Sequence, residues 1–131
     1  MSSNCVEKLY QACKAVDKID IEYVLESETP FKAKRRGGII DIRPDWEEVK
    51  VKIMEELLKL KFEIPMLKQK LIETEGMILI EGNYWRDKFW GVCNGAGENN
   101  LGELLMKMRQ QITNEPLLIF DREEIYGRIQ L

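Results

Sequence analysis

The sequence predicts a mainly α-helical domain of the α+β class, with a few short strands. Two observations lead to this prediction. Apolar residues recur at the spacing of an amphipathic helix through most of the chain, whereas extended apolar runs are short and few. The 131 residues are 44% hydrophobic and 33% charged, which is typical of a globular protein with a real core. We therefore expect residues 1–131 to form a single domain.

The first predicted helix covers residues 6–18. Glu7, Gln11 and Lys14 fall at i, i+4 and i+7, so they share one face, which Tyr10 flanks. This face is either a solvated surface with a weak Glu–Lys pairing or a carboxylate and an amine presented to one pocket. In the second case, burial would lower the pKa of the lysine and make proton transfer or nucleophilic attack available.

A second short helix is predicted at 20–28, where Pro30 ends it. The following segment, 31–38, carries four cations within five residues: Lys32, Lys34, Arg35 and Arg36. They could clamp phosphates, or they could form a soluble basic turn. Residues 39–43 are expected to be extended.

The longest predicted helix begins at Asp45, which has the spacing of a capping box with Glu48. Its apolar side is typical of a core helix. Another helix is predicted to begin at Pro65 and to end at Gly76. Residues 77–80 are apolar and are expected to form a short buried strand.

A glycine-rich loop from Gly91 to Gly97 leads into the last long helix, whose first turn Asn99 or Asn100 can cap. Free N–H groups and the positive dipole end at such a helix start suit a phosphate or a carboxylate, although an ordinary core helix can also follow such a loop. The aromatic-rich segment 83–90 before the loop could stack on a base or pack internally.

The C-terminal residues 113–131 are predicted to form a strand extension. Residues 117–120 and 125–131 are candidate short strands around a turn at 121–124. They could complete the sheet or serve an oligomer contact, and the sequence favours neither.

Composition excludes several classes of function. The net charge of −3 argues against non-specific electrostatic binding of nucleic acid, but it leaves recognition of one modified nucleotide open. The absence of histidine excludes Ser-His-Asp and Cys-His catalysis and most zinc chemistry, so acid–base work must come from carboxylates, lysine, tyrosine or cysteine. The three cysteines lack metal-ligand spacing and are interpreted as reduced thiols in a cytoplasmic protein. We expect no membrane span and no signal peptide.

Several segments match one protein family in order. The most specific combination is Asp-x-x-Trp-Gly at 87–91, followed by Gly-x-Asn-x-Leu-Gly and Leu-Met-x-x-Arg within 97–109. Further matching segments lie at 6–15, 33–37, 43–46, 53–54, 61–62, 71–74 and 79–81. Over most of residues 5–112 the sequence resembles the NADAR family, also called YbiA-like.

The resemblance implies a compact, mainly helical YbiA-like domain with a pocket for ADP-ribose or a related ribosyl compound, and cleavage of N-glycosidic bonds. Some members of the family act on early riboflavin-pathway intermediates. Others remove ADP-ribose from guanine bases in nucleic acid, and some of these act as antitoxins. The resemblance implies neither a metal nor a cofactor.

Five positions carry over from the family residue by residue. Glu7 matches its acidic residue on the first helix, and Lys14 matches the lysine of its Gln-Ala-x-Lys segment. Asp87 and Trp90 match Asp-x-x-Trp-Gly, and Asn99 matches the asparagine of Gly-x-Asn-x-Leu-Gly.

The sequence departs from the family pattern in two places. Lys8 stands where members usually have histidine. Members also usually begin with a segment carrying a Phe-Ser-Asn-Phe type motif near the pocket, whereas the present sequence starts almost at the first helix. The second departure concerns the activity of the site and its contacts with the base.

Together these observations predict a pocket in which Glu7, Lys14 and Asp87 are catalytic. The predicted substrate-binding residues are Tyr10, Gln11, Lys34, Arg35, Arg43, Trp90, Gly91 and Asn99, and Lys32 is a further candidate for a diphosphate. No metal site is predicted.

The predicted function is an N-glycosidase that removes ADP-ribose from a guanine base in nucleic acid, with Lys14 in covalent or acid chemistry and Glu7 as its acid–base partner. One alternative is an N-glycosidase acting on ribosylamino intermediates of the riboflavin pathway. Another is a protein that binds ADP-ribose or a nucleotide without cleaving it. The expected partner is ADP-ribose or an ADP-ribosylated base in DNA or RNA, not a membrane, and the oligomeric state is open.

Overall fold

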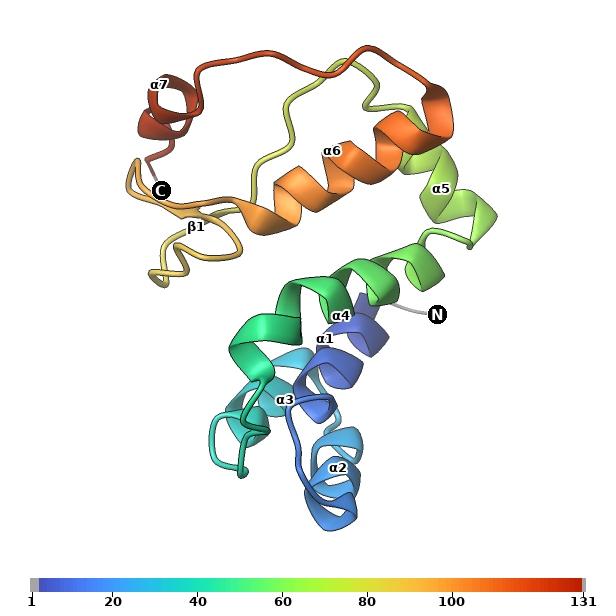
Figure 1. The fold of residues 1–131 in the computed structure, drawn as a ribbon, viewed down its shortest axis with the longest axis vertical. Helices are drawn as coiled ribbons and strands as arrows, with labels where there is room; N and C mark the ends of the chain where they lie inside the picture. Colours follow the sequence, from blue (N-terminus) through green and yellow to red (C-terminus); the bar gives the residue numbers. More distant parts are fainter. Residues whose placement is uncertain (1–2, 131) are drawn as a thin grey trace. The chain divides into compact units, whose positions relative to one another are not determined.

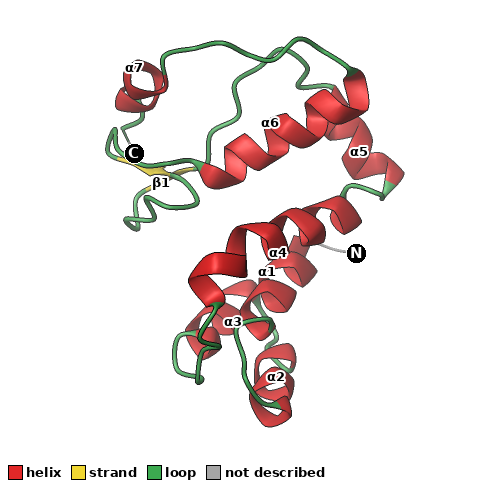
Figure 2. Ribbon diagram, viewed as in Figure 1, coloured by secondary structure: helices red, strands yellow, loops and turns green. Residues whose placement is uncertain are grey.

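The computed structural model describes residues 3–130, and helices make up most of this range (Figure 2). The helices are α1 (Ser3–Ala12), α2 (Lys18–Leu25), α3 (Pro30–Gly37), α4 (Trp46–Lys61), α5 (Pro65–Ile72), α6 (Asn100–Thr113) and α7 (Arg122–Gly127), and the strands are β1 (Gly82–Asn83) and β2 (Val92–Cys93). The predicted mainly helical class is confirmed. None of the helices within residues 3–130 has the length and apolar character that crossing a bilayer requires.

The chain divides into two compact units, which are described separately: unit 1 (Met1–Leu67) and unit 2 (Lys68–Leu131). In unit 1, α1 contacts α2, α3 and α4 (Figure 1). A small apolar core lies where α1, α2 and α3 meet, formed by Ala12, Val24, Ala33 and Ile40. The two alanines let the helix backbones approach closely, because their side chains take up little space. The prediction of a single domain stays a prediction.

Helix α1 ends earlier than predicted. The N–H of Lys14 donates to the carbonyl of Gln11 at 3.2 Å, and the N–H of Ala15 donates to the carbonyl of Ala12 at 3.1 Å. These i→i+3 bonds tighten the chain into a turn, so Lys14 lies just beyond the helix. The carbonyl of Lys14 then accepts the N–H of Arg43 at 2.7 Å, beside one antiparallel bridge that involves the segment predicted to be extended.

The basic segment forms helix α3 and not a turn, which was one of the two alternatives that the sequence left open. Thr29 is the N-cap of α3, and its side chain accepts the N–H of Lys32 at 3.1 Å. Pro30 occupies the start of the helix, where its missing N–H carries no penalty. Thr29 and Pro30 start the helix, and the glycines at 37 and 38 only end it.

Helix α4 confirms the predicted core helix, but the predicted capping box is wrong. The side chain of Asp45 makes no capping hydrogen bond. Its two carboxylate oxygens instead accept the Nε and Nη2 of Arg43, at 2.5 and 2.8 Å. This bidentate pairing competes with the helix N–H groups for the same oxygens.

In unit 2 the two short strands form a parallel pair, with Gly82 opposite Val92. The predicted strand at 77–80 is wrong, because this run forms no strand ladder. It packs instead along the start of α6, where a Cβ on Gly102 would lie 2.2 Å from the carbonyl oxygen of Leu79. Only glycine allows so close an approach of the two backbones.

The predicted C-terminal strands are also wrong. Residues 117–120 are irregular, and residues 122–127 form α7. Asp121 caps this helix by accepting the N–H of Glu124 at 3.1 Å, which explains why the expected turn residues begin a helix. Leu131, the last residue of the predicted strand, lies outside the described residues.

The side chain of Arg109 is fully buried and hydrogen-bonds to three segments of unit 2. Its Nε donates to Glu115 at 2.5 Å, and its Nη1 donates to the carbonyl and hydroxyl of Thr74 at 2.8 and 3.0 Å. Its Nη2 donates to the carbonyl of Met77 at 2.8 Å, and Glu115 also accepts the N–H of Gly76 at 2.8 Å. One guanidinium thus ties α6 to the segment that follows α5.

Arg109→Ala should unfold unit 2 at a markedly lower denaturant concentration. The substitution leaves a buried acceptor set without its donor, and the expected loss of unfolding free energy is about 3–5 kcal/mol. The matched control is Arg128→Ala, which breaks an exposed pair with Glu124 and should cost less than about 1 kcal/mol. Equal effects of the two substitutions in urea unfolding would show that the buried guanidinium has no special role.

Candidate functional site

The residues predicted for the site divide between the two units. Unit 1 carries Glu7, Tyr10, Gln11, Lys14, Lys34, Arg35 and Arg43. Unit 2 carries Asp87, Trp90, Gly91 and Asn99. The prediction that both groups face one sugar stays a prediction.

The amine of Lys14 lies against two aromatic rings. Its Nζ is 5.9 Å from the ring centroid of Tyr10 and 5.9 Å from that of Trp46. The two rings contact each other with centroids 5.0 Å apart and an interplanar angle of 58°, and both side chains are buried. The rings remove water from one side of the amine while their faces attract its positive form.

Burial lowers the pKa of the Lys14 ammonium below its usual value. The Glu7 carboxylate raises this pKa, and the charges of Lys34 and Lys50 lower it again. Because burial is the largest effect, a larger fraction of Lys14 is neutral than of an exposed lysine at the same pH. A neutral amine is the nucleophilic form.

Gln11 orients Glu7 and is itself almost fully buried. Its Nε2 donates to Glu7 Oε1 at 2.9 Å, as the i, i+4 spacing predicts. The Oε1 of Gln11 has no hydrogen-bond partner among the described residues and lies against Gly37. A Cβ on Gly37 would stand 2.1 Å from that oxygen, so glycine here makes room for Gln11.

The cations of α3 point in different directions. Lys32 pairs with Glu28 at 3.4 Å. Arg36 donates to the carbonyl of Tyr23 at 2.7 Å and its guanidinium lies 4.5 Å from the centre of that ring. The helix therefore spreads charges that the sequence suggested would act together.

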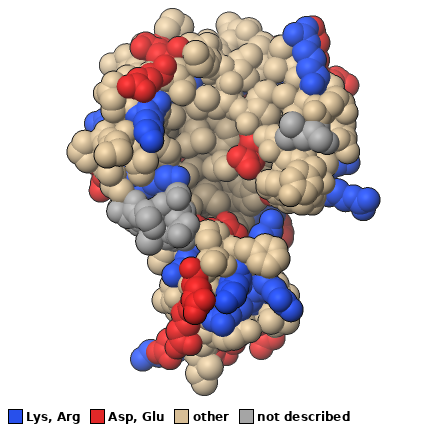
Figure 3. Space-filling model, turned by 180° about the vertical axis from the view of Figure 1, so that it is seen from behind, with Lys and Arg blue, Asp and Glu red and all other residues tan. Residues whose placement is uncertain are grey.

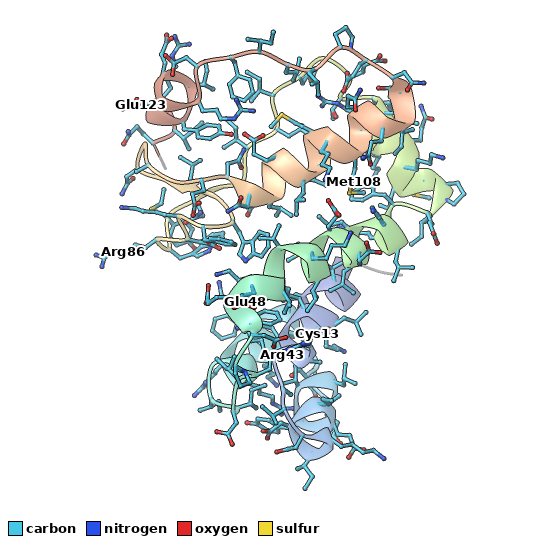
Figure 4. The ribbon with its side chains drawn as sticks, in the orientation of Figure 1. Cys13, Arg43, Glu48, Arg86, Met108 and Glu123 are labelled. Carbon is cyan, nitrogen blue, oxygen red and sulfur yellow. The ribbon has the colours of Figure 1, made fainter. Side chains whose placement is uncertain are left out.

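Lys34 and Arg35 are both exposed, and the positive charge of Lys34 lowers the pKa of Lys14. Arg43 lies beside Cys13 at the end of α1 (Figure 4). Burial raises the pKa of the Cys13 thiol, and the charge of Arg43 lowers it by less. Cys13 and Cys93 are free thiols, and the side chain of Cys5 lies outside the described part of the chain.

Asp87 organises the turn that leads to Trp90. Its Oδ1 accepts the N–H of Phe89 at 3.2 Å and that of Trp90 at 2.9 Å. The fully buried amide of Asn83 pairs with both backbone groups of Asp87, at 3.0 and 2.8 Å. Arg86 points outward from this turn (Figure 4) in a left-handed conformation, with φ of 65°.

Asn99 occupies the N-cap position of α6, as predicted, but its side chain makes no capping hydrogen bond. Its Oδ1 accepts the N–H of Glu81 at 2.9 Å, and its Nδ2 donates to the carbonyl of Leu79 at 2.9 Å and to the hydroxyl of Tyr126 at 3.0 Å. The side chain is fully buried, and all of its donors are used within the unit. Asn99 as a substrate contact stays a prediction.

Three N–H groups at the start of α6 are already bonded within unit 2. The N–H groups of Asn99, Asn100 and Leu101 donate to the carbonyls of residues 89–91 at 3.0–3.2 Å. These bonds join the helix start to the preceding turn. Of the two alternatives that the sequence left open, these three amides therefore favour an ordinary core helix over a phosphate site.

Two residues of interest are not predicted from the sequence. Trp46 lies in the matching segment 43–46, and its ring centroid is 5.9 Å from Lys14 Nζ. Glu81, in the Leu-Ile-Glu segment, received no role. Burial raises the pKa of the Glu81 carboxyl, and the charge of Asp87 raises it further. The signal in both cases was the presence of the residue in a segment shared with the family.

A cavity of about 610 Å³ lies beside the glycine-rich loop in unit 2, lined by residues that include Glu98, Glu103, Arg122 and Tyr126. Glu103 accepts the Tyr126 hydroxyl at 2.7 Å and the Arg122 guanidinium at 2.5 and 3.1 Å. Helix α7 thus contributes to this cavity and, through Tyr126, to the position of Asn99.

Charges of both signs are interspersed on the face drawn in Figure 3, and neither sign dominates it. This distribution agrees with the small net charge. Within residues 3–130 no group of three cysteine, aspartate or glutamate side chains could hold a metal ion.

Comparison with known proteins gives the same family as the sequence motifs. The model of the NADAR domain matches residues 1–113, which confirms the resemblance. An N-glycosidase of Nostoc punctiforme is 37% identical over 116 residues, which cover 83% of this chain and 74% of that protein. N-glycosidase YbiA of Escherichia coli is 34% identical over 113 residues, covering 83% of this chain and 70% of that protein.

Two further similarities concern a plant protein and a solved structure. Riboflavin biosynthesis protein PYRR of Arabidopsis thaliana is 43% identical over 76 residues, which cover 56% of this chain but only 12% of that protein. The NMR structure of E. coli YbiA matches with a TM-score of 0.75 and 32% identity, over 88% of this chain and 71% of that one. The YbiA-like fold is confirmed.

Lys14 should lose its proton at a lower pH than Lys52. Burial lowers the pKa of Lys14, whereas hydrogen bonds to Glu56 and Glu55 raise that of Lys52. NMR titration of the lysine ¹³Cε resonances measures both midpoints in one sample, and Lys14→Arg identifies the signal. Glu7→Gln should lower the Lys14 midpoint further, because Glu7 favours the charged form. A Lys14 midpoint at or above that of Lys52 would show that the rings do not desolvate the amine.

Proposed function

We propose that this chain, which belongs to the NADAR family, is an N-glycosidase that hydrolyses an N-ribosyl bond. The first candidate substrate is ADP-ribose attached to a guanine base in nucleic acid. The observation that supports the proposal is the half-buried amine of Lys14, which lies against two aromatic rings. The carboxylate of Glu7, which Gln11 holds by a hydrogen bond, raises the pKa of this amine. Such an amine suits nucleophilic attack on a sugar carbon.

In the proposed reaction the neutral amine of Lys14 attacks C1′ of the ribose. A C1′–Nζ bond forms while the C1′–N bond to the base breaks, and the base nitrogen takes a proton from a carboxylic acid. Nζ then loses a proton and O4′ gains one as the ring opens, which gives a Schiff base. Water adds at C1′ and releases the amine, so one water is consumed for each base and sugar released.

Glu7 is the proposed acid–base partner of Lys14. Its Oε1 is fixed by the Gln11 amide, and Oε2 remains available to take the proton that Nζ loses. The direct alternative uses Glu7 to activate water, with no covalent step. Both routes require the carboxylate to be held in place, which Gln11 and the space at Gly37 provide.

Two ammonium groups near Lys14 suit an anionic substrate. The positive charges of Lys34 and Lys50 lower the pKa of Lys14, whereas the carboxylates of Glu7 and Glu47 raise it, and Glu47 pairs with Lys50 at 2.5 Å. A phosphate near these ammonium groups would reduce their mutual repulsion. A phosphate is common to ADP-ribose and to phosphorylated sugar intermediates, so it does not distinguish the two.

The second candidate substrate is a ribosylamino intermediate of the riboflavin pathway. The observation that favours it is the similarity to PYRR, whose name places it in riboflavin biosynthesis. Both candidates carry a ribose linked to nitrogen at C1′, so the same residues would serve either reaction.

The two candidates should be separated by mass spectrometry on three compounds: a DNA oligonucleotide carrying ADP-ribosylated guanine, a ribosylamino-pyrimidine phosphate, and free ADP-ribose. We expect cleavage of the first. Lys14→Ala and Glu7→Gln should each reduce the rate by about 10²-fold or more. The matched control is Lys18→Ala, which changes an exposed lysine on α2 and should leave the rate unaltered.

Cleavage of the pyrimidine compound alone would favour the second candidate. If neither compound is cleaved while calorimetry detects ADP-ribose binding that survives in both variants, the protein is a binding protein and the proposed hydrolysis is excluded.

A further inference from the structure

The segment that follows β1 in unit 2 places two neighbouring aromatic side chains in solvent. Tyr84 is 75% exposed and Trp85 is 50% exposed. Their rings contact each other edge to face, with centroids 5.1 Å apart and an interplanar angle of 81°. Phe89 and Trp90 form a second such pair, at 4.8 Å, but these two residues are half-buried. Of the four aromatic residues in this segment, one pair therefore packs on the fold and the other faces solvent.

The turn that carries the exposed rings is held closed by Asn83. The fully buried amide of Asn83 donates to the carbonyl of Asp87 at 2.8 Å and accepts the N–H of Asp87 at 3.0 Å. The backbone of Asn83 is itself paired with Cys93 in the parallel ladder. Residues 84–86 therefore project from a base that is fixed at both ends, and a preformed turn binds a ligand at little cost in ordering.

Arg86, in this turn, adopts a conformation that is uncommon for arginine. Its φ of 65° lies in the left-handed region, and such backbone strain is frequent at binding sites. Its side chain points outward (Figure 4), and Lys88 is also exposed. Asp87, between these cations, directs Oδ1 at the N–H groups of Phe89 and Trp90. The turn thus exposes two aromatic rings and two positive side chains within a short segment.

We propose that the turn 84–88 is a docking surface for a single strand of nucleic acid. Base faces stack on the exposed rings of Tyr84 and Trp85. The charges of Arg86 and Lys88 pair with phosphates of the same strand. This inference goes beyond the proposed glycosidase activity and concerns unit 2 alone.

The chemistry of the turn favours a single strand over other macromolecules. The base faces of a duplex are already stacked on one another, so they are not available to the exposed rings. The net charge of −3 does not supply the broad electrostatic attraction by which proteins bind a duplex backbone without reading its sequence. An apolar protein surface would cover the rings but would leave both cations without a counter-charge, whereas a strand supplies its own phosphates.

Fluorescence anisotropy with a short, unmodified oligodeoxynucleotide tests the stacking. The wild type should bind the labelled single strand more tightly than the same sequence as a duplex. Trp85→Ala and Tyr84→Ala should each weaken binding about tenfold. Trp85→Phe should retain most of the affinity, because phenylalanine keeps a stacking face. The matched control is Ile119→Ala, which changes an apolar side chain that is 98% exposed and should leave binding unaltered.

The salt dependence of the same binding tests the two cations. Arg86→Asn and Lys88→Ala should each reduce the slope of log Kd against log salt by about 0.7, the value for one phosphate contact on a single strand. Asparagine replaces Arg86 because it tolerates the left-handed conformation. The matched control is Lys70→Ala, which changes an exposed lysine of α5 and should leave the slope unaltered.

Three results would overturn the proposed surface. They are equal binding by the wild type and Trp85→Ala, equal binding of single strand and duplex, and a wild-type dimer in sedimentation that Trp85→Ala dissociates while no strand binds. The last result would assign the rings to a contact between copies of the chain. Because the probe carries no ribosyl modification, cleavage of an N-riboside by a protein that does not bind the strand would refute this surface and leave the proposed activity standing.

Discussion

The desolvation of one amine is the constraint on which the proposed chemistry of Lys14 depends. Lys14 lies just beyond α1, where the turn directs it against the rings of Tyr10 and Trp46. Water is the best solvent for an ammonium group, so this environment disfavours the charged form. Glu7 limits the effect, because a carboxylate stabilises the same charge. The balance leaves a lysine whose neutral form is accessible without being permanent, which is what a group that both attacks and leaves a sugar carbon requires.

In unit 2, residues of the shared motif serve the fold directly. Asp87 and Asn99 both direct their side chains at backbone groups, and these bonds define the turn before Trp90 and the start of α6. Gly91 and Gly102 permit the close backbone contacts that complete this arrangement. The side chains of Asp87 and Asn99 are hydrogen-bonded to the backbone, whereas the Glu81 carboxyl makes no hydrogen bond or ion pair among the described residues. The motif therefore also fixes the backbone of a half-buried carboxyl that lies outside it.

The sequence was informative where partners are close along the chain. The i, i+4 bond between Gln11 and Glu7, the long helix α4 and the mainly helical class all follow from local periodicity. It failed where the partner lies far away in sequence. Asn99 carries the side chain of a cap but bonds instead to Leu79 and Tyr126, 20 and 27 residues away. Burial likewise decides the acidity of Glu81, and burial is a property of the folded chain that spacing does not contain.

The most direct test of the account is reductive trapping of Lys14. Wild-type protein that is turning over its N-riboside is treated with sodium borohydride, and the peptide containing Lys14 is analysed by mass spectrometry. The account predicts a stable adduct with the mass of the reduced sugar on Lys14, formed only with substrate present and absent from Lys14→Arg, which is inactive. Turnover without an adduct, together with an active Lys14→Arg variant, would contradict it.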